Sequence, residues 1–381
     1  MRNKPLYVHS PIYPRRELLD EYIDGIYRSG WLTNNGPLVD ELETALARYL
    51  DVPFLVLTAN GTSALQIALK ANCAAGEVIT TPFTFPATGQ AITWCGNGIR
   101  FADIDPDTLS LDPDQVVRQI HSRTSAIMPV NLYGTAHHTG DLESLARQHE
   151  VPLIFDSAHC FGPPTPAQKK ALLSGTAAVL SFHATKIFNT VEGGAIVTRD
   201  EDLYRRAKAM INFGMVEGQP SLVGTNAKMN ELEAAFGLAN LTDLDTHLQR
   251  RQEGTAWYRQ GLEPLIEAGD IRVIPSANDS YMPLLFRDPD QVEPFNAALA
   301  AVSIFGRRYF HPLQPGCDVS RLPIAREVTR RIYCLPLHSH LEQEDVTEIC
   351  DLLASTLECN RPTRPAGMLP LGMAQATEAL S

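Results

Sequence analysis

Lys186 is the residue whose surroundings most clearly point to chemistry. It lies in residues 181–189, where an apolar run ends in hydroxyls and an imidazole, and an earlier apolar run, 151–155, ends in the carboxylate of Asp156. A pyridoxal phosphate enzyme needs both groups: an amine that binds the cofactor's aldehyde as an imine, and a carboxylate that keeps the pyridine nitrogen protonated. Taken singly, a strand-end aspartate is more often a helix cap, and a lone lysine more often lies on the surface.

A turn with phosphate-binding character follows an apolar run at residues 54–57. Residues 60–63, Asn-Gly-Thr-Ser, combine a glycine with two hydroxyls at the point where an amphipathic helix is predicted to begin. The unpaired amides and the positive dipole end of such a helix favour a phosphate group. An ordinary capped helix is the alternative, since Asn, Thr and Ser are good N-caps. Ser181 offers a further hydroxyl from across the expected site.

The elements that must position these residues follow an alternating pattern. Short apolar runs separated by helical patterns are predicted as strands at 77–80, 99–102, 126–130, 151–155, 177–181 and 195–198. This alternation predicts an α/β fold in which a mostly parallel sheet is covered by helices on both faces. Ligands of such sheets bind beyond the carboxyl ends of the strands, where Asn60, Phe83, Asp156 and Ser181 fall.

The second part of the chain predicts a smaller unit. After Lys228 the pattern becomes helical, and residues 243–262 predict a long connecting helix on which Arg250 and Arg251 are expected to face solvent. The expected elements beyond it are a strand at 281–286 and helices near 294–302 and 344–357. The expected division is a large domain, 1–245, a small C-terminal domain, 246–360, and a loosely held tail, 361–381.

Composition limits the class of protein. The 381 residues, 44% hydrophobic and 20% charged, can bury a large core. A formal net charge of −12 argues against nonspecific binding to nucleic acid or to acidic membranes. Seven scattered cysteines, an odd number, predict free thiols in a cytoplasmic protein, without a disulfide framework or a structural zinc.

The sequence also predicts that the protein has no secretory signal, no membrane span and no metal site. The start of the chain lacks the apolar core of a secretory signal, and the longest uncharged stretch, 78–99, contains two prolines, so we expect no transmembrane segment. We also expect no metal, because His137, His138 and Asp141 are better explained by a loop and a helix cap.

Seven ordered blocks of sequence carry a family resemblance. They are 31–37, 60–65, 81–88, 156–159, 181–186, 192–195 and 224–231. Together they resemble the DegT/StrS-type sugar aminotransferases, which are fold-type I pyridoxal phosphate enzymes. The resemblance implies an α/β large domain whose mostly parallel sheet lies between helices, a smaller C-terminal α+β domain, and a homodimer with shared active sites.

The resemblance also implies roles for single residues. Lys186 corresponds to the Schiff-base lysine, Asp156 to the partner of the ring nitrogen, Phe85 to the residue that stacks on the ring, and His159 to a neighbour of the ring hydroxyl. The implied cofactor contacts are Gly61, Thr62, Ser63, Phe85, Asp156, His159, Ser181 and His183, with Asn226 supplied by the neighbouring subunit. The implied substrate contacts are Trp31, Thr33, Lys228, Arg308 and Tyr309. Without the resemblance, the cluster at 307–312 is equally a nucleotide diphosphate site or a surface feature.

The implied reaction is a ping-pong transamination with glutamate as the amino donor. Pyridoxamine phosphate carries the amine between the two half-reactions, and Lys186 moves the proton. The blocks at 31–37, 181–186 and 192–194 look most like the branch that aminates C4 of dTDP-4-keto-6-deoxyglucose to give dTDP-4-amino-4,6-dideoxyglucose. Alternatives are C3 amination, a UDP-linked sugar, or a noncatalytic regulatory homologue. Dehydrating relatives carry histidine in place of the lysine, so Lys186 disfavours that chemistry.

Overall fold

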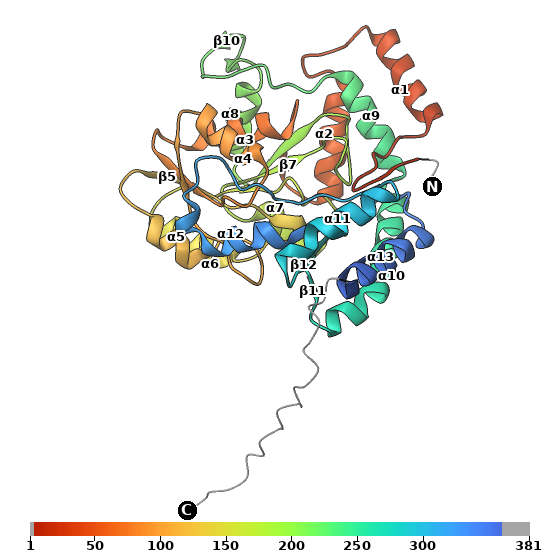
Figure 1. Cartoon of the computed structure of the whole chain (residues 1–381). Coiled ribbons are helices and arrows are strands. Elements are labelled where there is room, and N and C mark those ends of the chain that lie inside the picture. Colours follow the sequence, from red (N-terminus) through yellow and green to blue (C-terminus); the bar gives the residue numbers. More distant parts are fainter. Residues whose placement is uncertain (1–3, 360–381) are drawn as a thin grey trace, which may run out of the picture.

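A seven-stranded central sheet organises the larger part of the protein, whose computed structural model describes residues 4–359 (Figure 1). Two hydrogen-bonded groups of strands, β2-β8-β7-β6 and β4-β3-β5, are joined by parallel bridges between β5 and β6. The strands are β2 (Phe54–Thr58), β3 (Glu77–Thr80), β4 (Gly98–Phe101), β5 (Thr124–Met128), β6 (Ile154–Asp156), β7 (Ala177–Ser181) and β8 (Gly194–Thr198). Among these strands β8 alone runs against the others, so the predicted mostly parallel sheet is confirmed.

Both faces of this sheet are buried, which explains the uninterrupted apolar runs. Successive side chains of a strand point to opposite faces, and in β7 Leu180 packs into one core while Val179 packs into the other. The first core is covered by α2 (Pro37–Leu50), α5 (Pro113–Gln119), α6 (Thr139–Gln148), α7 (Pro166–Leu173) and α9 (Glu231–Thr242). The second is covered by α3 (Gly61–Asn72), α4 (Pro86–Trp94) and α8 (Glu201–Met210).

A smaller unit with its own core lies beside the large sheet. It begins with the long helix α10 (Leu244–Glu267), which follows α9 directly and confirms the predicted connecting helix. Its other elements are β11 (Ile271–Val273), β12 (Met282–Phe286), β14 (Ile332–Leu335), α11 (Val292–Ala301), α12 (Pro323–Arg331) and α13 (Gln343–Cys359). The three strands form an antiparallel sheet in the order β11-β12-β14. Tyr258, Phe286 and Leu353 belong to the core packed between this sheet and the helices.

Short elements complete the fold and bear on the domain limits. They are α1 (Arg16–Ser29), β1 (Leu6–Tyr7), β9 (Met215–Val216), β10 (Gln219–Pro220), β13 (Ile304–Phe305), and the 3-10 turns Leu132–Gly134, Pro289–Gln291 and Val319–Arg321. Because β1 pairs in parallel with β13, the N-terminal segment lies against the smaller unit. The division at residues 245 and 246 stays a prediction, and the predicted loose tail, 361–381, lies outside the described residues.

One expectation about α10 is wrong. Arg251 was expected to face solvent, but its side chain is only 1% exposed, and its guanidinium donates to the carbonyl oxygen of Leu337 at 3.0 Å. Arg250, the preceding residue, pairs instead with Glu253 and Glu342 near the surface. Because consecutive side chains of a helix point about 100° apart, Arg251 lies on the buried side of α10 while Arg250 lies at the surface.

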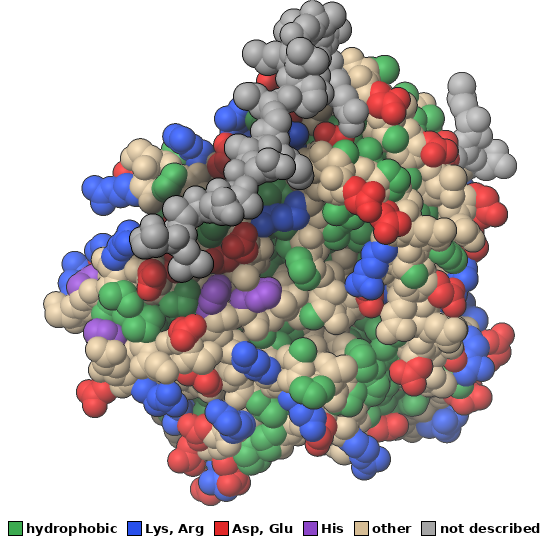
Figure 2. Space-filling model, turned by 90° about the horizontal axis from the view of Figure 1, so that it is seen from below, with side chains coloured by type: hydrophobic (Ala, Val, Ile, Leu, Met, Phe, Trp, Pro, Cys, Tyr) green, Lys and Arg blue, Asp and Glu red, His purple; other side chains and the backbone are tan. Residues whose placement is uncertain are grey.

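The surface carries charges of both signs. On the face seen from below in Figure 1, acidic and basic side chains are interspersed among apolar ones (Figure 2). Over residues 4–359, no helix combines the length and the apolar character needed to cross a membrane.

A buried carboxylate joins two of the sequence blocks. Glu231, at the start of α9, is fully buried, and its side chain accepts hydrogen bonds from the amides of Leu38 and Val39, each at 3.0 Å. These amides open α2, whose N-cap is Gly36 and therefore has no side chain to cap them. The Glu231 amide in turn donates to the carbonyl oxygen of Leu32 at 3.0 Å. The carboxylate thus caps α2 from a distant helix and fastens residues 31–36 to residues 226–231.

Glu231→Ala is expected to lower the free energy of unfolding by about 2–3 kcal/mol, because two buried amides lose a charged acceptor. Urea denaturation followed by circular dichroism measures the change. Glu41→Ala, at an exposed position on α2, the helix that Glu231 caps, is the matched control and should change the stability by less than about 0.5 kcal/mol. Equal stabilities for the two variants would show that the cap contributes nothing.

Candidate active site

A cavity of about 640 Å³ lies at the carboxyl ends of the parallel strands. The segments that follow β2, β6 and β7 form one side of the cavity, and the smaller unit forms another side. Of the predicted site residues, those on its wall are Gly61, Thr62, Ser63, Phe85, Asp156, His159, Ser181, His183, Lys186 and Tyr309. The structure therefore gathers residues that are far apart in the sequence into one concave site.

Lys186 occupies a tight turn after β7. Its amide donates to the carbonyl oxygen of His183 at 2.8 Å, and its amine donates to the hydroxyl of Tyr281 at 3.3 Å. Burial lowers the pKa of the amine to about 8, although the charges of Asp156 and Cys160 act in the opposite direction. The amine therefore loses its proton more readily than an ordinary lysine, a property that suits a nucleophile or a proton carrier.

Asp156 is the last residue of β6, and two hydrogen bonds hold its carboxylate. The Thr88 hydroxyl donates to one oxygen at 2.7 Å, and the amide of Ala158 donates to the other at 3.1 Å. Burial raises the pKa of this carboxyl, and these hydrogen bonds and the Lys186 charge only partly offset the rise. A cation within the cavity would complete the compensation.

The start of α3 forms the end of the cavity. The Asn60 side chain accepts from the Ser63 amide at 2.8 Å and so caps the helix, whose first turn carries Gly61 and Thr62. A side chain on Gly61 would lie 3.0 Å from Ser181 Cβ, and one on Gly194 would lie 2.7 Å from the backbone of Asn60 and Gly61. Glycines at positions 61 and 194 allow the start of α3, the end of β7 and the start of β8 to lie this close together. The amides and hydroxyls of these segments surround a small space that is suited to an anion.

Two rings border the middle of the cavity. Phe85, at the start of α4, keeps 53% of its surface exposed although its neighbours Phe83 and Thr84 are buried. His159 is buried, and its Nδ1 lies 3.3 Å from the donating amide of Tyr133, so the ring proton is assigned to Nε2. Burial, with smaller contributions from Lys186 and His9, holds the pKa of His159 well below its usual range. The imidazole is therefore a neutral hydrogen-bond donor.

The mouth of the cavity carries an imidazole and a carboxylate that face each other. His183 lies with Nε2 3.5 Å from a carboxylate oxygen of Glu192, and its Nδ1 lies 2.9 Å from the Thr185 hydroxyl. Both His183 and Glu192 line the cavity and are exposed. Glu192 precedes β8, and because that strand runs against its neighbours, its start reaches the same edge as the ends of the others.

Several predicted residues lie away from this wall. Trp31, Thr33 and Asn226 are exposed, and the Lys228 amine donates to Asn226 Oδ1 at 2.7 Å while lying 4.7 Å from the Phe213 ring centroid. None of these residues lines the cavity of its own chain.

The structure places Arg307, rather than Arg308, on the cavity wall. Arg308 pairs with Glu293 at 2.9 Å and donates to the carbonyl oxygen of Thr329 at 2.8 Å, so its guanidinium is already engaged. Arg307 forms an antiparallel bridge with Cys334, which fixes its backbone. In this extended segment, adjacent side chains point to opposite sides, and a one-residue shift exchanges their environments.

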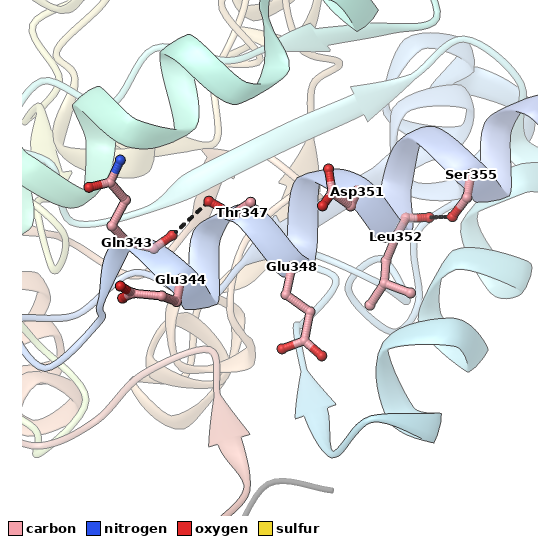
Figure 3. A pocket seen from close by; sticks show the side chains of 7 residues that line it. All are labelled: Gln343, Glu344, Thr347, Glu348, Asp351, Leu352 and Ser355. Atoms are coloured by element: carbon pink, nitrogen blue, oxygen red, sulfur yellow. Dashed lines mark hydrogen bonds between the residues drawn. The ribbon is translucent and has the colours of Figure 1, made fainter.

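A second hollow has no comparable chemistry. It measures about 760 Å³, more than the cavity above, but all seven residues that line it come from α13, along which their side chains are spread (Figure 3). They include the carboxylates of Glu344, Glu348 and Asp351 and no amine or imidazole. Within residues 4–359 no group of three or more His, Cys, Asp or Glu is arranged to hold a metal ion. The amine, imidazole and hydroxyl groups predicted to be functional line the strand-end cavity instead.

Known proteins resemble this chain in sequence and in fold. Residues 15–354 match the model of the DegT/DnrJ/EryC1/StrS aminotransferase family. The chain belongs to this family. The dTDP-4-amino-4,6-dideoxy-D-glucose transaminases of Shigella dysenteriae and Escherichia coli are 38% and 34% identical to it, over 93% of this chain and 98% and 99% of theirs. The crystal structure of DesI in the presence of its TDP-sugar product superposes with a TM-score of 0.87 at 35% identity, covering 93% of this chain and 94% of that one.

Membership of this family makes the chain an aminotransferase of the pyridoxal phosphate-dependent type. The residues of the cavity fit that cofactor. The buried Asp156 carboxylate lacks a full cationic partner, the glycine-lined start of α3 leaves space for a phosphate, and the exposed Phe85 ring offers a flat apolar surface. These three features match the nitrogen, the phosphate and the ring face of one molecule.

Tyr281, Glu192 and Thr88 are site residues that the sequence analysis did not identify. Arg307 lay inside the candidate cluster at 307–312 but was not chosen as a substrate contact. Thr88 lies inside the block at 81–88, and Glu192 opens the block at 192–195, so both had a local signal. Tyr281 had none, because it precedes an apolar strand of the smaller unit and meets Lys186 only after the two units pack.

The low pKa of Lys186 predicts a pH-dependent effect on stability. Its amine titrates near pH 8 in the folded protein and near its ordinary value of 10.5 in the unfolded chain. Between these values the unfolded chain binds more protons, so the wild type gains stability as the pH rises. Cofactor-free Lys186→Met should therefore be more stable than the wild type below pH 8, and this advantage should shrink as the pH approaches 10.5.

Thermal unfolding of both proteins across this pH range measures the difference. Lys70→Met, at an exposed position near the end of α3, controls for the loss of any surface amine. A Lys186→Met advantage that stays constant with pH would show that the amine is not held in its neutral form by burial.

Proposed function

We propose that this protein transfers an amino group from glutamate to C4 of dTDP-4-keto-6-deoxyglucose and produces dTDP-4-amino-4,6-dideoxyglucose. The observation that carries the proposal is the cavity in which Lys186 and Asp156 meet at the start of α3, within a chain 38% identical over almost its full length to a transaminase named for that product. The seven cysteines are free, which supports the further proposal of a cytoplasmic location.

Lys186 is proposed to carry the proton in both half-reactions. Pyridoxal phosphate, when bound, supplies an electron-withdrawing ring and a carrier for the amino group. The Lys186 amine takes a proton from the α-carbon of the donor and returns it to the carrier, and in the second half-reaction it acts in reverse on the sugar. A pKa of about 8 suits both directions, since the amine neither holds nor releases its proton too firmly.

The other residues are proposed to hold the cofactor. Asp156 would pair with the ring nitrogen, and its hydrogen bonds from Thr88 and Ala158 fix the direction of the carboxylate. His159 would donate from Nε2 to the ring oxygen, since its Nδ1 faces the Tyr133 amide. The first turn of α3 with Ser181 would bind the phosphate.

Other substrates and roles stay open to test. The same cavity could accept a 3-keto sugar or a UDP-linked sugar, because position on the sugar depends on how the whole substrate is oriented. A noncatalytic homologue is the alternative of a different class. The lowered pKa of Lys186 opposite a buried carboxylate argues against it, because such an arrangement is costly to a protein that makes no use of it.

A homodimer with composite sites is proposed from the exposed face around residues 213–232. Phe213, Val223 and Leu232 are large apolar side chains with more than half of their surface exposed, and Trp31 and Leu32 lie on the segment fastened to the same region by Glu231. Asn226 and Lys228 belong to this face and not to the cavity of their own chain. A two-fold partner would cover the apolar groups and bring these polar side chains to its own site.

The substrate proposal predicts that purified protein with pyridoxal phosphate and glutamate converts dTDP-4-keto-6-deoxyglucose into the 4-amino sugar, identified by mass spectrometry and nuclear magnetic resonance. Lys186→Ala should lose at least about a hundredfold in rate, because it lacks the proton carrier. Parallel reactions with UDP-linked and 3-keto substrates rank the alternatives. A faster reaction with either of these, or activity of Lys186→Ala within tenfold of wild type, would contradict the assignment.

The composite-site proposal predicts complementation between two inactive variants. Mixed heterodimers of Lys186→Ala and Asn226→Ala should contain one doubly damaged site and one intact site, and so recover up to half of the wild-type activity per dimer. Differently tagged chains, purified through both tags, supply the heterodimer. An active monomer in sedimentation, or no recovery although Asn226→Ala alone is inactive, would place Asn226 at the site of its own chain.

A further inference from the structure

Tyr281 supplies the contact from the smaller unit to the Lys186 amine. The tyrosine lies immediately before β12, is buried, and lines the cavity. Its hydroxyl oxygen accepts from the amine at 3.3 Å across the junction of the two units. No role for Tyr281 follows from the cofactor contacts described above, which are all on the larger unit or proposed to come from a partner.

Surrounding rings hold the Tyr281 side chain in place. The His159 ring centroid lies 4.5 Å away, and His9 and Tyr309 contact the phenol edge to face at 5.1 and 5.6 Å. His9 comes from the N-terminal segment, so three separate parts of the chain enclose one ring. Packing of this kind restricts the phenol to one rotamer and aims its hydroxyl at Lys186.

Asn278 fixes the backbone that carries Tyr281. Its side-chain amide donates to the carbonyl oxygens of His159 at 2.8 Å and Phe161 at 2.7 Å, in the segment that follows Asp156. The Ser280 hydroxyl donates to Asn278 Oδ1 at 2.7 Å and completes the connection. The loop before β12 is thus fastened to the segment that carries the catalytic carboxylate, and its position relative to Lys186 is set by these bonds.

We propose that Tyr281, fixed by Asn278, is a positioning residue that holds the Lys186 amine in the cavity while the amine carries a proton. The hydrogen bond itself stands independently of the substrate, whereas its use in proton transfer rests on the proposed function. A hydroxyl is suited to this task because it accepts from a charged amine and donates to a neutral one, so the contact persists as the proton moves.

The electrostatic surroundings of Tyr281 indicate that its phenol positions the Lys186 amine and does not exchange a proton with it. Burial, reinforced by the neighbouring Tyr309 and Cys334, raises the pKa of Tyr281 well above its usual range, so the hydroxyl keeps its proton. The charged or titratable groups that face Lys186 are Asp156 and Cys160, which favour its charged form, and His159 and His9, whose own pKa values are lowered by burial. The phenol of Tyr281 is the remaining contact that can form a hydrogen bond with both the charged and the neutral Lys186 amine.

The direct test measures Lys186 in cofactor-free protein. Trace acetylation across a pH series, read by mass spectrometry, gives the pKa of the amine without any turnover. In Tyr281→Phe the midpoint for Lys186 should fall by roughly 0.5 to 1 pH unit, because the lost hydrogen bond is stronger to the charged amine than to the neutral one. Tyr258→Phe removes the hydroxyl of another buried tyrosine of the smaller unit, which donates to Pro336, and should leave that midpoint unchanged.

A second variant tests the role of Asn278. Asn278→Ala keeps the phenol but releases its loop, and its Lys186 midpoint should move in the same direction as that of Tyr281→Phe. This variant also decides the matter if Tyr281→Phe does not fold. In the loaded enzyme, Tyr281→Phe should slow the donor half-reaction about tenfold with little change in donor affinity, as expected for a lost aid to general acid-base catalysis.

An unchanged Lys186 midpoint in the folded variants would overturn the proposal, whatever the activity. A normal midpoint together with slow turnover would likewise overturn it, since the phenol would then act elsewhere. Absence of sugar amination by the wild type with a shifted midpoint in Tyr281→Phe would instead reject the proposed function and leave the positioning role in place.

Discussion

The active site depends on the burial of a lysine and an aspartate that only partly compensate each other. Burial pushes the pKa of Lys186 down and that of Asp156 up, so each group is drawn toward its neutral form. Two well-placed hydrogen bonds to the carboxylate and one from the amine reduce this cost without removing it. A protein interior tolerates such under-compensated groups only where the surrounding structure is firmly held. The same imbalance would favour the binding of a ligand with complementary charges.

The sheet supplies the required rigidity through strand direction. Parallel strands deliver Asp156 and Ser181 to one edge, while the reversed strand β8 presents its first residue, Gly194, at that edge. Gly194 lies directly under the backbone of Asn60 and Gly61, so the strand reversal also allows α3 to begin close to Ser181. The single antiparallel strand β8 therefore has two effects. It places Glu192 at the cavity mouth, and it supports the turn at residues 60–63, which is of a phosphate-binding type.

Local patterns were sufficient to predict the strands, the α3 turn and the connecting helix, because each is specified by short-range periodicity and capping. Lys186 and Asp156 were recognisable because each ends an apolar run. Long-range packing could not be predicted from such local patterns. Nothing in the local sequence distinguishes Arg251, which is buried, from Arg250, which is not. The same limit separates Arg307 from Arg308, since their environments depend on a bridge to Cys334 in a distant segment.

Residues remote from the cavity still determine its geometry. Glu231 is not on the wall of the cavity, yet its carboxylate holds the start of α2 and the segment 31–36 against α9. Asn278 likewise lies outside the cavity wall but ties the loop of Tyr281 to the residues after Asp156. In both cases a polar side chain joins distant segments through long-range hydrogen bonds. The positions of the reactive groups are therefore set by connections between distant segments, and substitutions at these connecting residues should alter the site without changing any group that meets the substrate.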